Sequence, residues 1–411
     1  MADSLETNAV TGFLSVSGTI PKSFIQAEKC LENLKKNYKS ILSEFPTLRL
    51  KLITKDNIPY WYYATNDEIQ LDKLVKLDNE PFEDEPPLPY DLSEKPLWRF
   101  NITQFKEKTK LKMTCCHCII DGRAIFDLFD IFASVAIGKE YSERINSYRN
   151  QPALYEFGKK VWYTKEITDK KIENPFDKLS NLNNRINPKI TVPSHFINPQ
   201  WEVPYPPISK FCRKHGISPQ SILMAIQNEA VRNFNKNIKE DFLIPIYIPI
   251  DNRKMKYSSE IFKKCLFFNH IGAIMPFLQK ENNILENIKK SFKLLKEGLN
   301  ETFTCDFNYY ISNMRDLETG KMKFISNYPD ALCFSFASHI GLVCEGFDDI
   351  QFKSNNPISE NLYWACFYGY HNQETFYFMY SIPYNCPEDF LKSVKDVSMK
   401  YYNFIVNDIK E

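Results

Sequence analysis

The sequence has little histidine, little glycine and almost no net charge. Its 411 residues include 6 histidines and 12 glycines, and 52 basic side chains stand against 51 acidic ones, which gives a formal net charge of +1. A chain with this balance has no general electrostatic field that would gather a nucleic acid or an acidic membrane. We therefore expect no nucleic-acid partner. With so few histidines, each one can be weighed separately as a candidate for chemistry.

A long hydrophobic run and a regular cysteine framework are also missing. The strongly apolar run at residues 243–250 contains Pro245 and Pro249, and it is far shorter than the ~20 residues that span a bilayer. The 11 cysteines are odd in number and irregularly spaced, unlike those of a small secreted disulfide domain. The first residues, MADSLETN, are polar and acidic, unlike a signal peptide. We therefore expect a cytoplasmic protein with reduced thiols and no transmembrane segment.

The length is too great for one hydrophobic core, because such cores stop growing near ~250 to 300 residues. Between residues 174 and 207 the composition changes abruptly, with prolines at positions 175, 188, 193, 199, 204, 206 and 207. Proline fixes φ and has no N–H, which disfavours regular secondary structure in this stretch. We predict an N-terminal half over residues 1–173, a proline-rich crossover linker over 174–207 and a C-terminal half over 208–411.

Both halves alternate β-prone runs with amphipathic stretches, which predicts an α/β fold with mixed sheets. In the first half we expect strands near residues 12–20, 48–53, 60–64, 98–105 and 111–117, and helices over 23–42 and 123–137. Ser23 and Gln26 form a capping-box pattern that would start the first of these helices. In the second half we expect helices over 208–214, 220–234, 283–300 and 388–406, and strands over 242–250, 266–277, 331–343, 363–370 and 375–382. Neither half shows the regular alternation of a parallel doubly wound fold.

Residues 115–122, CCHCIIDG, are the most informative stretch. They lie where a predicted strand ends and a helix is about to begin, and Asp121 followed by Gly122 is a turn signal. A side chain at such a junction projects into a cleft. His117 could act there as a general base, because the ordinary histidine pKa of ~6.5 leaves the imidazole largely neutral at pH 7.

Three cysteines beside His117 also raise zinc binding and a thiol nucleophile as alternatives. Consecutive strand residues point to opposite faces, so Cys115 and His117 would face one way, and Cys116 and Cys118 the other. This separation disfavours a zinc site and a Cys–His pair, and we expect no metal. The plainest alternative is that His117 is a hydrogen-bonded histidine at a strand end, with no chemical role.

The string HCIIDG resembles the H-x-x-x-D-G signature of the superfamily of CoA-dependent acyltransferases. This superfamily includes chloramphenicol acetyltransferase, alcohol acetyltransferases, plant BAHD acyltransferases and the condensation domains of peptide synthetases. Further segments resemble it in the right order along nearly the whole chain. They are FPTLR at 45–49, YDLS at 90–93, PLWR at 96–99, FCRKHGIS at 211–218, PIDNR at 249–253, FNHIG at 268–272 and SHIG at 338–341.

The resemblance implies two chloramphenicol-acetyltransferase-like halves in a V-shaped arrangement with a channel at their interface. His117 would deprotonate a small hydroxyl or amine acceptor, which would attack the thioester of an acyl-CoA without an acyl-enzyme intermediate. The Gly122 N–H is a candidate donor to the oxyanion, because glycine lets the main chain approach closely. Acyl-CoA would be a co-substrate, and we expect a monomer with no bound cofactor. With a net charge near zero, the CoA phosphates would need a local cluster of Lys and Arg, which the sequence does not place.

The resemblance also assigns supporting residues. In the family the aspartate of the motif is mainly architectural and pairs with an arginine, which matches an ion pair between Asp121 and Arg49. We expect Asp251 and Arg253 to form a structural charge pair that supports the site. Three residues in the later matching segments are candidates to line the channel or to stabilise the oxyanion: Asn269, Ser338 and Gly341.

Two departures from the family pattern narrow the prediction. Cys116 stands where condensation domains carry a second histidine, and the D-F-G-W-G motif of the plant enzymes has no counterpart. The remaining pattern fits the alcohol acetyltransferase-like branch best. Two alternatives stay open: a catalytically silent binding or scaffold protein with the same fold, and a condensation-type enzyme that uses a carrier-bound donor.

The other histidines have plainer interpretations. We expect His215 to contact the carbonyl groups at a helix end and His371 to be solvated in a hairpin turn. His195 lies in the proline-rich stretch. We expect His270 and His339 to pack within the fold or to line the channel rather than to act in catalysis.

Overall fold

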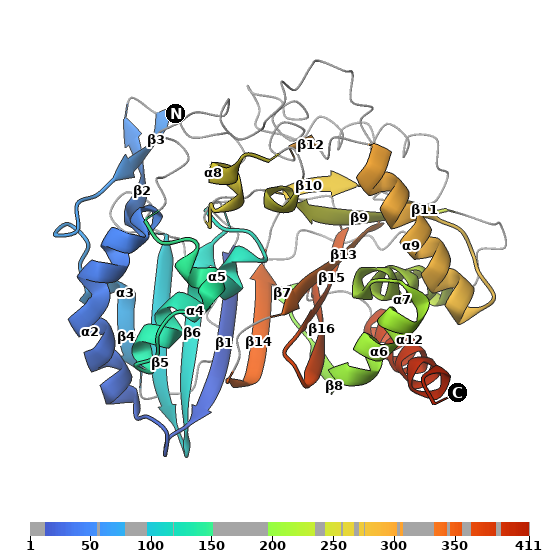
Figure 1. Ribbon diagram of the computed structural model, residues 1–411, viewed down its shortest axis with the longest axis horizontal. Coiled ribbons are helices and arrows are strands. Elements are labelled where there is room, and N and C mark those ends of the chain that lie inside the picture. Colours follow the sequence, from blue (N-terminus) through green and yellow to red (C-terminus); the bar gives the residue numbers. More distant parts are fainter. Residues whose placement is uncertain are drawn as a thin grey trace. The chain divides into compact units, whose positions relative to one another are not determined.

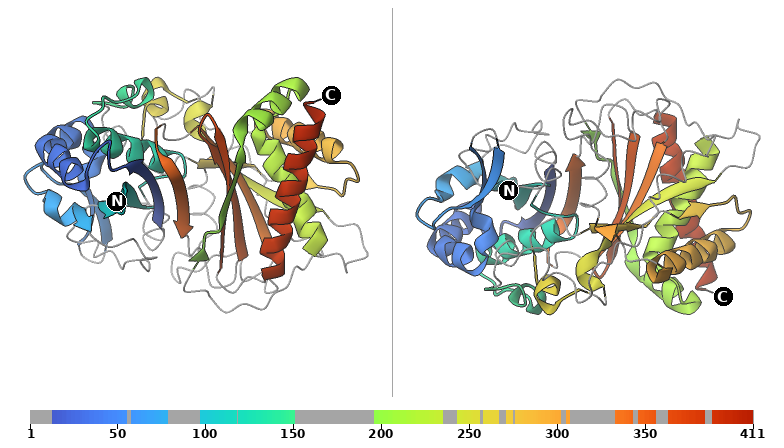
Figure 2. Two further views of the ribbon diagram at one scale, coloured as in Figure 1. Left: turned by 90° about the horizontal axis from the view of Figure 1, so that it is seen from below. Right: turned by 90° about the horizontal axis from the view of Figure 1, so that it is seen from above.

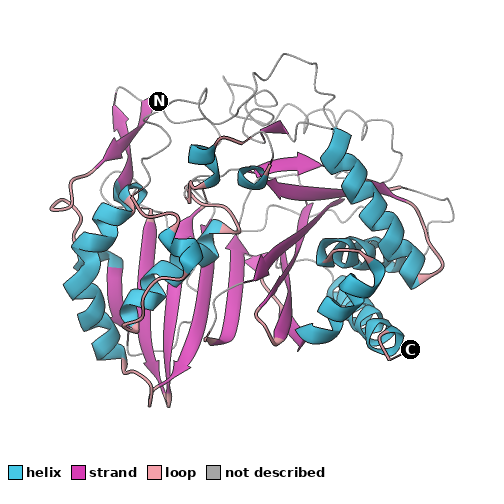
Figure 3. Cartoon of the chain, in the orientation of Figure 1, coloured by secondary structure: helices cyan, strands magenta, loops and turns pink. Residues whose placement is uncertain are grey.

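A computed structural model of the chain describes residues 13–55, 58–78, 97–117, 119–150, 196–234, 243–255, 258–266, 271–274, 276–301, 305–306, 333–342, 346–355, 363–383 and 388–410. The described chain forms two compact units (Figure 1). Each unit is built on a mixed β-sheet, and its long helices lie on one face of that sheet (Figures 2 and 3). The α/β class with mixed sheets, predicted from the sequence, is confirmed.

The first unit contains a five-stranded sheet. Its strand order is β14 (Asp348–Asn355), β1 (Phe13–Pro21), β6 (Lys108–Cys116), β5 (Trp98–Phe105) and β4 (Val75–Asp78). Neighbouring strands are antiparallel except β4 and β5, which are parallel. This unit also contains a hairpin of β2 (Leu50–Lys55) and β3 (Ile58–Tyr63). Its shorter helical elements are the 3₁₀ helices η2 (Pro46–Arg49) and η6 (Asn252–Lys254) and the α-helices α3 (Leu71–Leu74), α5 (Glu143–Asn146) and α8 (Glu260–Lys263).

Two helices, α2 (Ala27–Glu44) and α4 (Ala124–Ala136), pack on the apolar face of this sheet. Helix α4 has few polar residues and is buried along nearly its whole length, as expected for a helix enclosed in a core. Its Phe132 packs against Trp98 and Phe100 of β5, with ring centroids 4.8 and 5.4 Å away. These contacts fix the position of α4, whose N-terminus follows the histidine motif.

The second unit contains a nine-stranded sheet. Its main path is β12 (Cys305–Asp306), β10 (Ile271–Ile274), β9 (Ile244–Asp251), β13 (Cys333–Leu342), β15 (Tyr363–His371), β16 (Thr375–Pro383) and β7 (Phe196–Ile197). Two more strands, β11 (Phe277–Leu278) and β8 (Gln200–Pro204), pair with β9 and β16. Strands β9, β13 and β15 are parallel, and β16 is antiparallel to β15.

Four helices cover one face of the second sheet: α6 (Tyr205–His215), α7 (Pro219–Phe234), α9 (Ile284–Glu301) and α12 (Glu388–Asp408). Helix α7 is the central one and is buried along most of its length. Gly369 of β15 lets this helix approach, because a Cβ atom at that position would lie 2.7 Å from Phe376 and 2.8 Å from Leu223. A larger residue would force the side chains of Phe376 and Leu223 to move in this packed layer.

The division between the units differs from the single linker expected from the sequence. The first unit takes its residues from Met1–Lys170, Asp251–His270 and Cys344–Pro357, and the second from the segments between and after these. Strand β14 joins the first sheet by antiparallel pairing with β1, although it follows β13 of the second sheet in the chain. Assigning all of residues 208–411 to the second half therefore misplaces two segments. Local sequence patterns carry no information on such long-range strand pairing.

Two local predictions are wrong. The proline-rich stretch was expected to be irregular, but its end contains β7 and β8. Strand β8 begins after Pro199 and ends at Pro204, so the prolines bound this strand rather than interrupt it, as tolerated at a sheet edge. The first helix starts at Ala27, four residues later than the capping-box pattern indicated, and Gln26 makes no side-chain cap. No helix within the described ranges is long and apolar enough to cross a membrane.

Candidate active site

His117 lies at the junction between β6 and α4. Strand β6 ends at Cys116, and α4 starts at Ala124, so the motif forms the connecting turn as predicted. The Cys116 N–H donates to the Leu97 carbonyl at 2.8 Å, and the Ile119 N–H donates back to the Cys116 carbonyl at 3.2 Å. His117 is only 8% exposed. A buried imidazole on a turn with fixed backbone hydrogen bonds is held in position.

Burial lowers the pKa of His117 below its ordinary value of 6.5. Hydrogen bonds to the backbone at His117 and Ile120 and the charge of Asp121 oppose this effect without cancelling it. Desolvation disfavours the charged imidazolium, so the neutral ring predominates at neutral pH. The neutral ring is the form that can accept a proton.

Asp121 uses both carboxylate oxygens to hold the turn. Oδ1 accepts hydrogen bonds from the backbone N–H groups of Arg123 at 3.0 Å and Ala124 at 2.9 Å, at the start of α4. Oδ2 accepts from Nη2 of Arg253 at 2.6 Å. The carboxylate also sits at the positive end of the helix dipole, which attracts a negative charge. Asp121 therefore ties the first turn of α4 to the segment after β9.

Arg253 is the centre of a buried charge network. Its Nε donates to Oδ1 of Asp251 at 2.7 Å, and its Nη1 donates to the carbonyl groups of Cys265 at 3.3 Å and Leu266 at 3.0 Å. Burial alone would raise the pKa of Asp251, but the charge and hydrogen bonds of Arg253 outweigh it and lower that pKa. The expected ion pair between Asp251 and Arg253 is thus present, and Arg253 also forms an ion pair with Asp121.

The ion pair predicted between Asp121 and Arg49 is wrong. Arg49 ends the turn η2, and its Nη1 donates to the Ala64 carbonyl at 3.0 Å. Asp121 instead pairs with Arg253, which is 132 residues away in the sequence. The sequence identified Arg253 as a structural residue through its neighbour Asp251. Its contact with the motif depends on the tertiary fold, which residue spacing does not reveal.

Gly122 has open space beside it. No described atom outside its chain neighbours lies within 4 Å of a Cβ built at this position, and Gly122 is not among the glycines with positive φ. Neither the backbone conformation nor packing in the described part of the chain therefore demands a glycine here.

The remaining predicted site residues are not brought to the motif by the described contacts. Ser338 and Gly341 lie on β13 of the second unit, and Gly341 has a φ of 95° beside a register shift in the pairing with β15. Asn269 lies outside the described residues. The roles suggested for these three residues stay predictions.

The Cys115 thiol, two residues before His117, is a poor nucleophile. Cys115 and Cys116 are fully buried, and Cys118 lies outside the described residues. Burial raises the pKa of the Cys115 thiol well above its ordinary value, and the thiol is far less nucleophilic than the thiolate. Within the described ranges, no three His, Cys, Asp or Glu side chains are grouped to hold a metal ion.

His215 and His371 make contacts that the sequence did not indicate. His371 ends β15 and is 8% exposed, so the predicted solvated position is wrong. Its ring stacks on Tyr205 with the centroids 3.8 Å apart and on His339 at 5.4 Å. His215 bonds through Nε2 to Oδ2 of Asp408 at 2.8 Å and thereby joins α6 to α12. These are packing contacts of the second unit.

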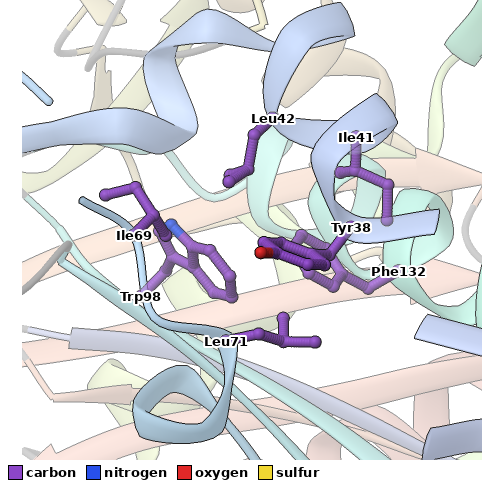
Figure 4. A pocket seen from close by; sticks show the side chains of 7 residues that line it. All are labelled: Tyr38, Ile41, Leu42, Ile69, Leu71, Trp98 and Phe132. Carbon is purple, nitrogen blue, oxygen red and sulfur yellow. The ribbon is translucent and has the colours of Figure 1, made fainter. Parts of the chain in front are cut away.

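A small apolar crevice opens between α2, α3 and β5 in the first unit (Figure 4). Its empty volume is about 200 Å³ including space shared with solvent. The Trp98 indole N–H in its wall is satisfied by the Leu48 carbonyl at 2.8 Å. The crevice has no charged lining side chain, so it offers packing space rather than chemistry. Its lining residues are Tyr38, Ile41, Leu42, Ile69, Leu71, Trp98 and Phe132.

The two mixed-sheet units define the class of fold. This is the CoA-dependent acyltransferase-like fold of condensation domains, which consists of two chloramphenicol-acetyltransferase-like subdomains. The resemblance noted in the sequence is confirmed at this level. The sequence itself matches no protein-family model and no curated protein.

Three solved structures illustrate the similarity. Polyketide synthase associated protein 5 from Mycobacterium tuberculosis is 14% identical, with a TM-score of 0.59 over 96% of this chain and 95% of that one. The epimerization domain from the third module of tyrocidine synthetase B is 12% identical, with a TM-score of 0.60 over 98% and 93%. A mutant starter condensation domain of rhizomide synthetase in complex with C8-CoA is 10% identical, with a TM-score of 0.60 over 99% and 94%.

Proposed function

We propose that the protein is an acyltransferase that moves an acyl group from a CoA thioester to a hydroxyl or amine acceptor. The observation that carries this proposal is the state of His117, a buried and neutral imidazole on a turn anchored by Asp121 and Arg253. The fold supports it, since solved structures with this fold include a condensation domain in complex with C8-CoA.

In this mechanism His117 takes the proton of the acceptor O–H or N–H as the acceptor oxygen or nitrogen attacks the thioester carbonyl carbon. The carbonyl π electrons move to the oxygen, which becomes an oxyanion, and the Gly122 N–H is the nearby candidate donor to it. When the oxyanion collapses, the C–S bond breaks and the sulfur takes the proton from the imidazolium. The products are the acylated acceptor and free CoA thiol, and His117 returns to its neutral state.

Asp121 and Arg253 would act as positioning residues in this scheme. Both carboxylate oxygens of Asp121 accept hydrogen bonds, one from the start of α4 and the other from Arg253. Asp121 therefore influences His117 through its charge and through the shape of the turn. Loss of either partner would move the imidazole away from the reacting atoms. A displacement of 1 Å in such a site can cost about 100-fold in rate.

A condensation-type reaction with a carrier-bound donor is the second candidate, and the similarity to condensation and epimerization domains favours it. Against it, Cys116 stands where condensation domains carry a second histidine. The two reactions share His117 and differ in the group that bears the thioester. A third alternative, a silent scaffold, would keep the fold without turnover.

A donor comparison tests these functions. Thiol release is followed with acetyl-CoA, longer acyl-CoAs and acyl groups loaded on a phosphopantetheinylated carrier protein, each against a panel of alcohols and amines. The acyltransferase predicts turnover with free acyl-CoA. Turnover with the carrier alone would establish the condensation-type reaction instead, and binding of CoA without thiol release would indicate the scaffold.

A further inference from the structure

Helix α4 carries a buried charge in its first turn. Asp127 is 1% exposed, although its neighbours in the sequence, Phe126 and Leu128, are buried and apolar. A carboxylate inside an apolar helix is costly unless cations pair with it. The reaction proposed for His117 does not involve this carboxylate, and packing alone would be met by an apolar residue.

Two arginines and a tyrosine enclose the Asp127 carboxylate. Nη2 of Arg123, four residues earlier, lies 3.1 Å from Oδ1, and Nη2 of Arg144 lies 2.5 Å from the same oxygen. The Tyr148 hydroxyl donates to Oδ2 at 3.4 Å. Arg144 belongs to α5, which lies beside α4 (Figure 1). Asp127 therefore ties the residue that precedes α4 to α5.

Arg123 is held by two different aspartates. Its backbone N–H donates to Oδ1 of Asp121 at 3.0 Å, and its guanidinium pairs with Asp127. Asp121 in turn pairs with Arg253 through Oδ2 at 2.6 Å. Charges of opposite sign therefore alternate through the motif and the start of α4. In order, the members of this charge cluster are Asp251, Arg253, Asp121, Arg123, Asp127 and Arg144.

Such a charge cluster can pair in more than one way. Arg123 follows Asp121 by two residues, whereas Arg253 comes from a segment 132 residues away. If Asp127 carried no charge, the Arg123 guanidinium would be drawn to Asp121, since charges interact strongly where water is excluded. Arg123 would then compete with Arg253 for Asp121. Loss of the Arg253 contact would shift the turn that carries His117.

Stability does not explain the charge of Asp127. Burial raises the pKa of Asp127 above its ordinary value of 3.8, and the charges of Arg123 and Arg253 oppose this effect without cancelling it. An acid whose pKa is raised on folding loses stability for the folded chain as the pH rises through the folded pKa, so the ionised carboxylate costs stability above that pKa. Buried ion pairs can instead specify one arrangement of the chain among several.

We propose that Asp127 is a positioning residue of the candidate active site, which holds Arg123 away from Asp121 and so keeps Arg253 as the partner of the motif aspartate. Its effect on turnover rests on the proposed function. Its effect on the ion pairs does not, and it can be measured without any turnover.

The variant Asp127→Asn keeps the shape of the side chain and removes its charge. A displacement of 1 Å can cost about 100-fold in rate, so a smaller shift of the turn should lower kcat about tenfold. The affinity for CoA should stay unchanged. The melting temperature should be unchanged or higher, because the side chains of Arg123 and Arg144 are 14% and 36% exposed and remain partly hydrated.

A second substitution separates positioning from a structural role. Asp127→Asn/Arg123→Met also removes the competing cation, so kcat should return to within about threefold of the wild type, a strongly non-additive result. A side chain needed only for packing would give no such rescue. The matched control is Asp130→Asn, which removes another carboxylate of α4 that pairs with Arg144 at 3.3 Å. It should leave kcat unchanged, because the pair of Asp127 and Arg123 stays in place.

Hydrogen exchange on peptides that cover residues 117–126 gives a readout that does not depend on activity. The N–H groups of Arg123 and Ala124 donate to Asp121. Their exchange should be about tenfold faster in Asp127→Asn, because the turn opens locally more often, and it should return to the wild-type rate in the double variant.

The outcomes distinguish this proposal from the proposed function. Turnover in Asp127→Asn equal to that of the wild type, or a double variant no more active than Asp127→Asn, would overturn the positioning role and leave the acyltransferase standing. Failure of Asp127→Asn to fold would overturn it as well. If the wild type releases no thiol from any acyl donor, the proposed function fails and the exchange rates decide: reversal by Arg123→Met supports the positioning role, and its absence refutes it.

Discussion

Removing the buried cation at the motif should destabilise the first unit strongly. Arg253→Met leaves Asp121, which is 3% exposed, without its cation, and it frees the carbonyl groups of Cys265 and Leu266. Breaking a buried ion pair from one side costs about 3–5 kcal/mol. The control Arg49→Met removes one hydrogen bond to a carbonyl group, which is worth about 1 kcal/mol.

Hydrogen exchange by mass spectrometry on peptides that cover residues 108–136 measures the free energy of local opening around the motif, and therefore the destabilisation that each substitution causes there. A local readout is needed because a chain of two units need not unfold in one step. Asp121→Asn removes the charge and keeps an oxygen that can accept from the start of α4. In a double-mutant cycle, Asp121→Asn and Arg253→Met should show a coupling of about 2 kcal/mol in the free energy of local opening. The effects of Asp121→Asn and Arg49→Met on that free energy should instead add within about 0.5 kcal/mol. Coupling of Asp121 to Arg49 and additivity with Arg253 would refute the network described above.

Three further predictions concern the motif itself. Burial lowers the pKa of His117 in the folded chain. The stability that the neutral ring contributes is therefore present above the unfolded pKa of ~6.5 and is lost as the pH falls through the folded pKa. If the urea midpoint of unfolding is measured between pH 7 and pH 5, the His117→Gln variant should show a smaller decrease than the wild type. Gly122→Ala should leave the melting temperature unchanged or slightly higher, because a methyl group meets no described atom within 4 Å, yet it should lower turnover about 10- to 100-fold by hindering the close approach of the substrate to the main chain. Unchanged turnover would show that the reaction does not need this close approach. Cys115 should resist alkylation at pH 8 in the folded chain and react once the chain is denatured, since burial raises the pKa of its thiol.

Much of the fold could be predicted from local pattern. Helix α4 lies within one residue of the expected bounds at each end, and the hairpin β15–β16 within one residue. These elements have strong periodicity and clear turn residues. Strand β14 was missed because its pairing with β1 joins residues more than 300 positions apart. Strand β8 was missed because prolines at its ends were interpreted as breaking it.

The candidate site could be predicted in part. The position of His117 after a strand and before a helix follows from its local sequence, and so does the pair of Asp251 and Arg253. The link from Arg253 to Asp121 could not be predicted, because it depends on how the segment after β9 folds back onto the first unit.

The central claim is that His117 is the general base of acyl transfer. It is tested most directly by thiol release from acyl-CoA in the presence of an accepted alcohol or amine, measured for the wild type and for His117→Ala. A general base contributes about 100- to 10,000-fold, so the variant should lose at least 100-fold in kcat while binding CoA with the affinity of the wild type. Full activity in His117→Ala would contradict the mechanism.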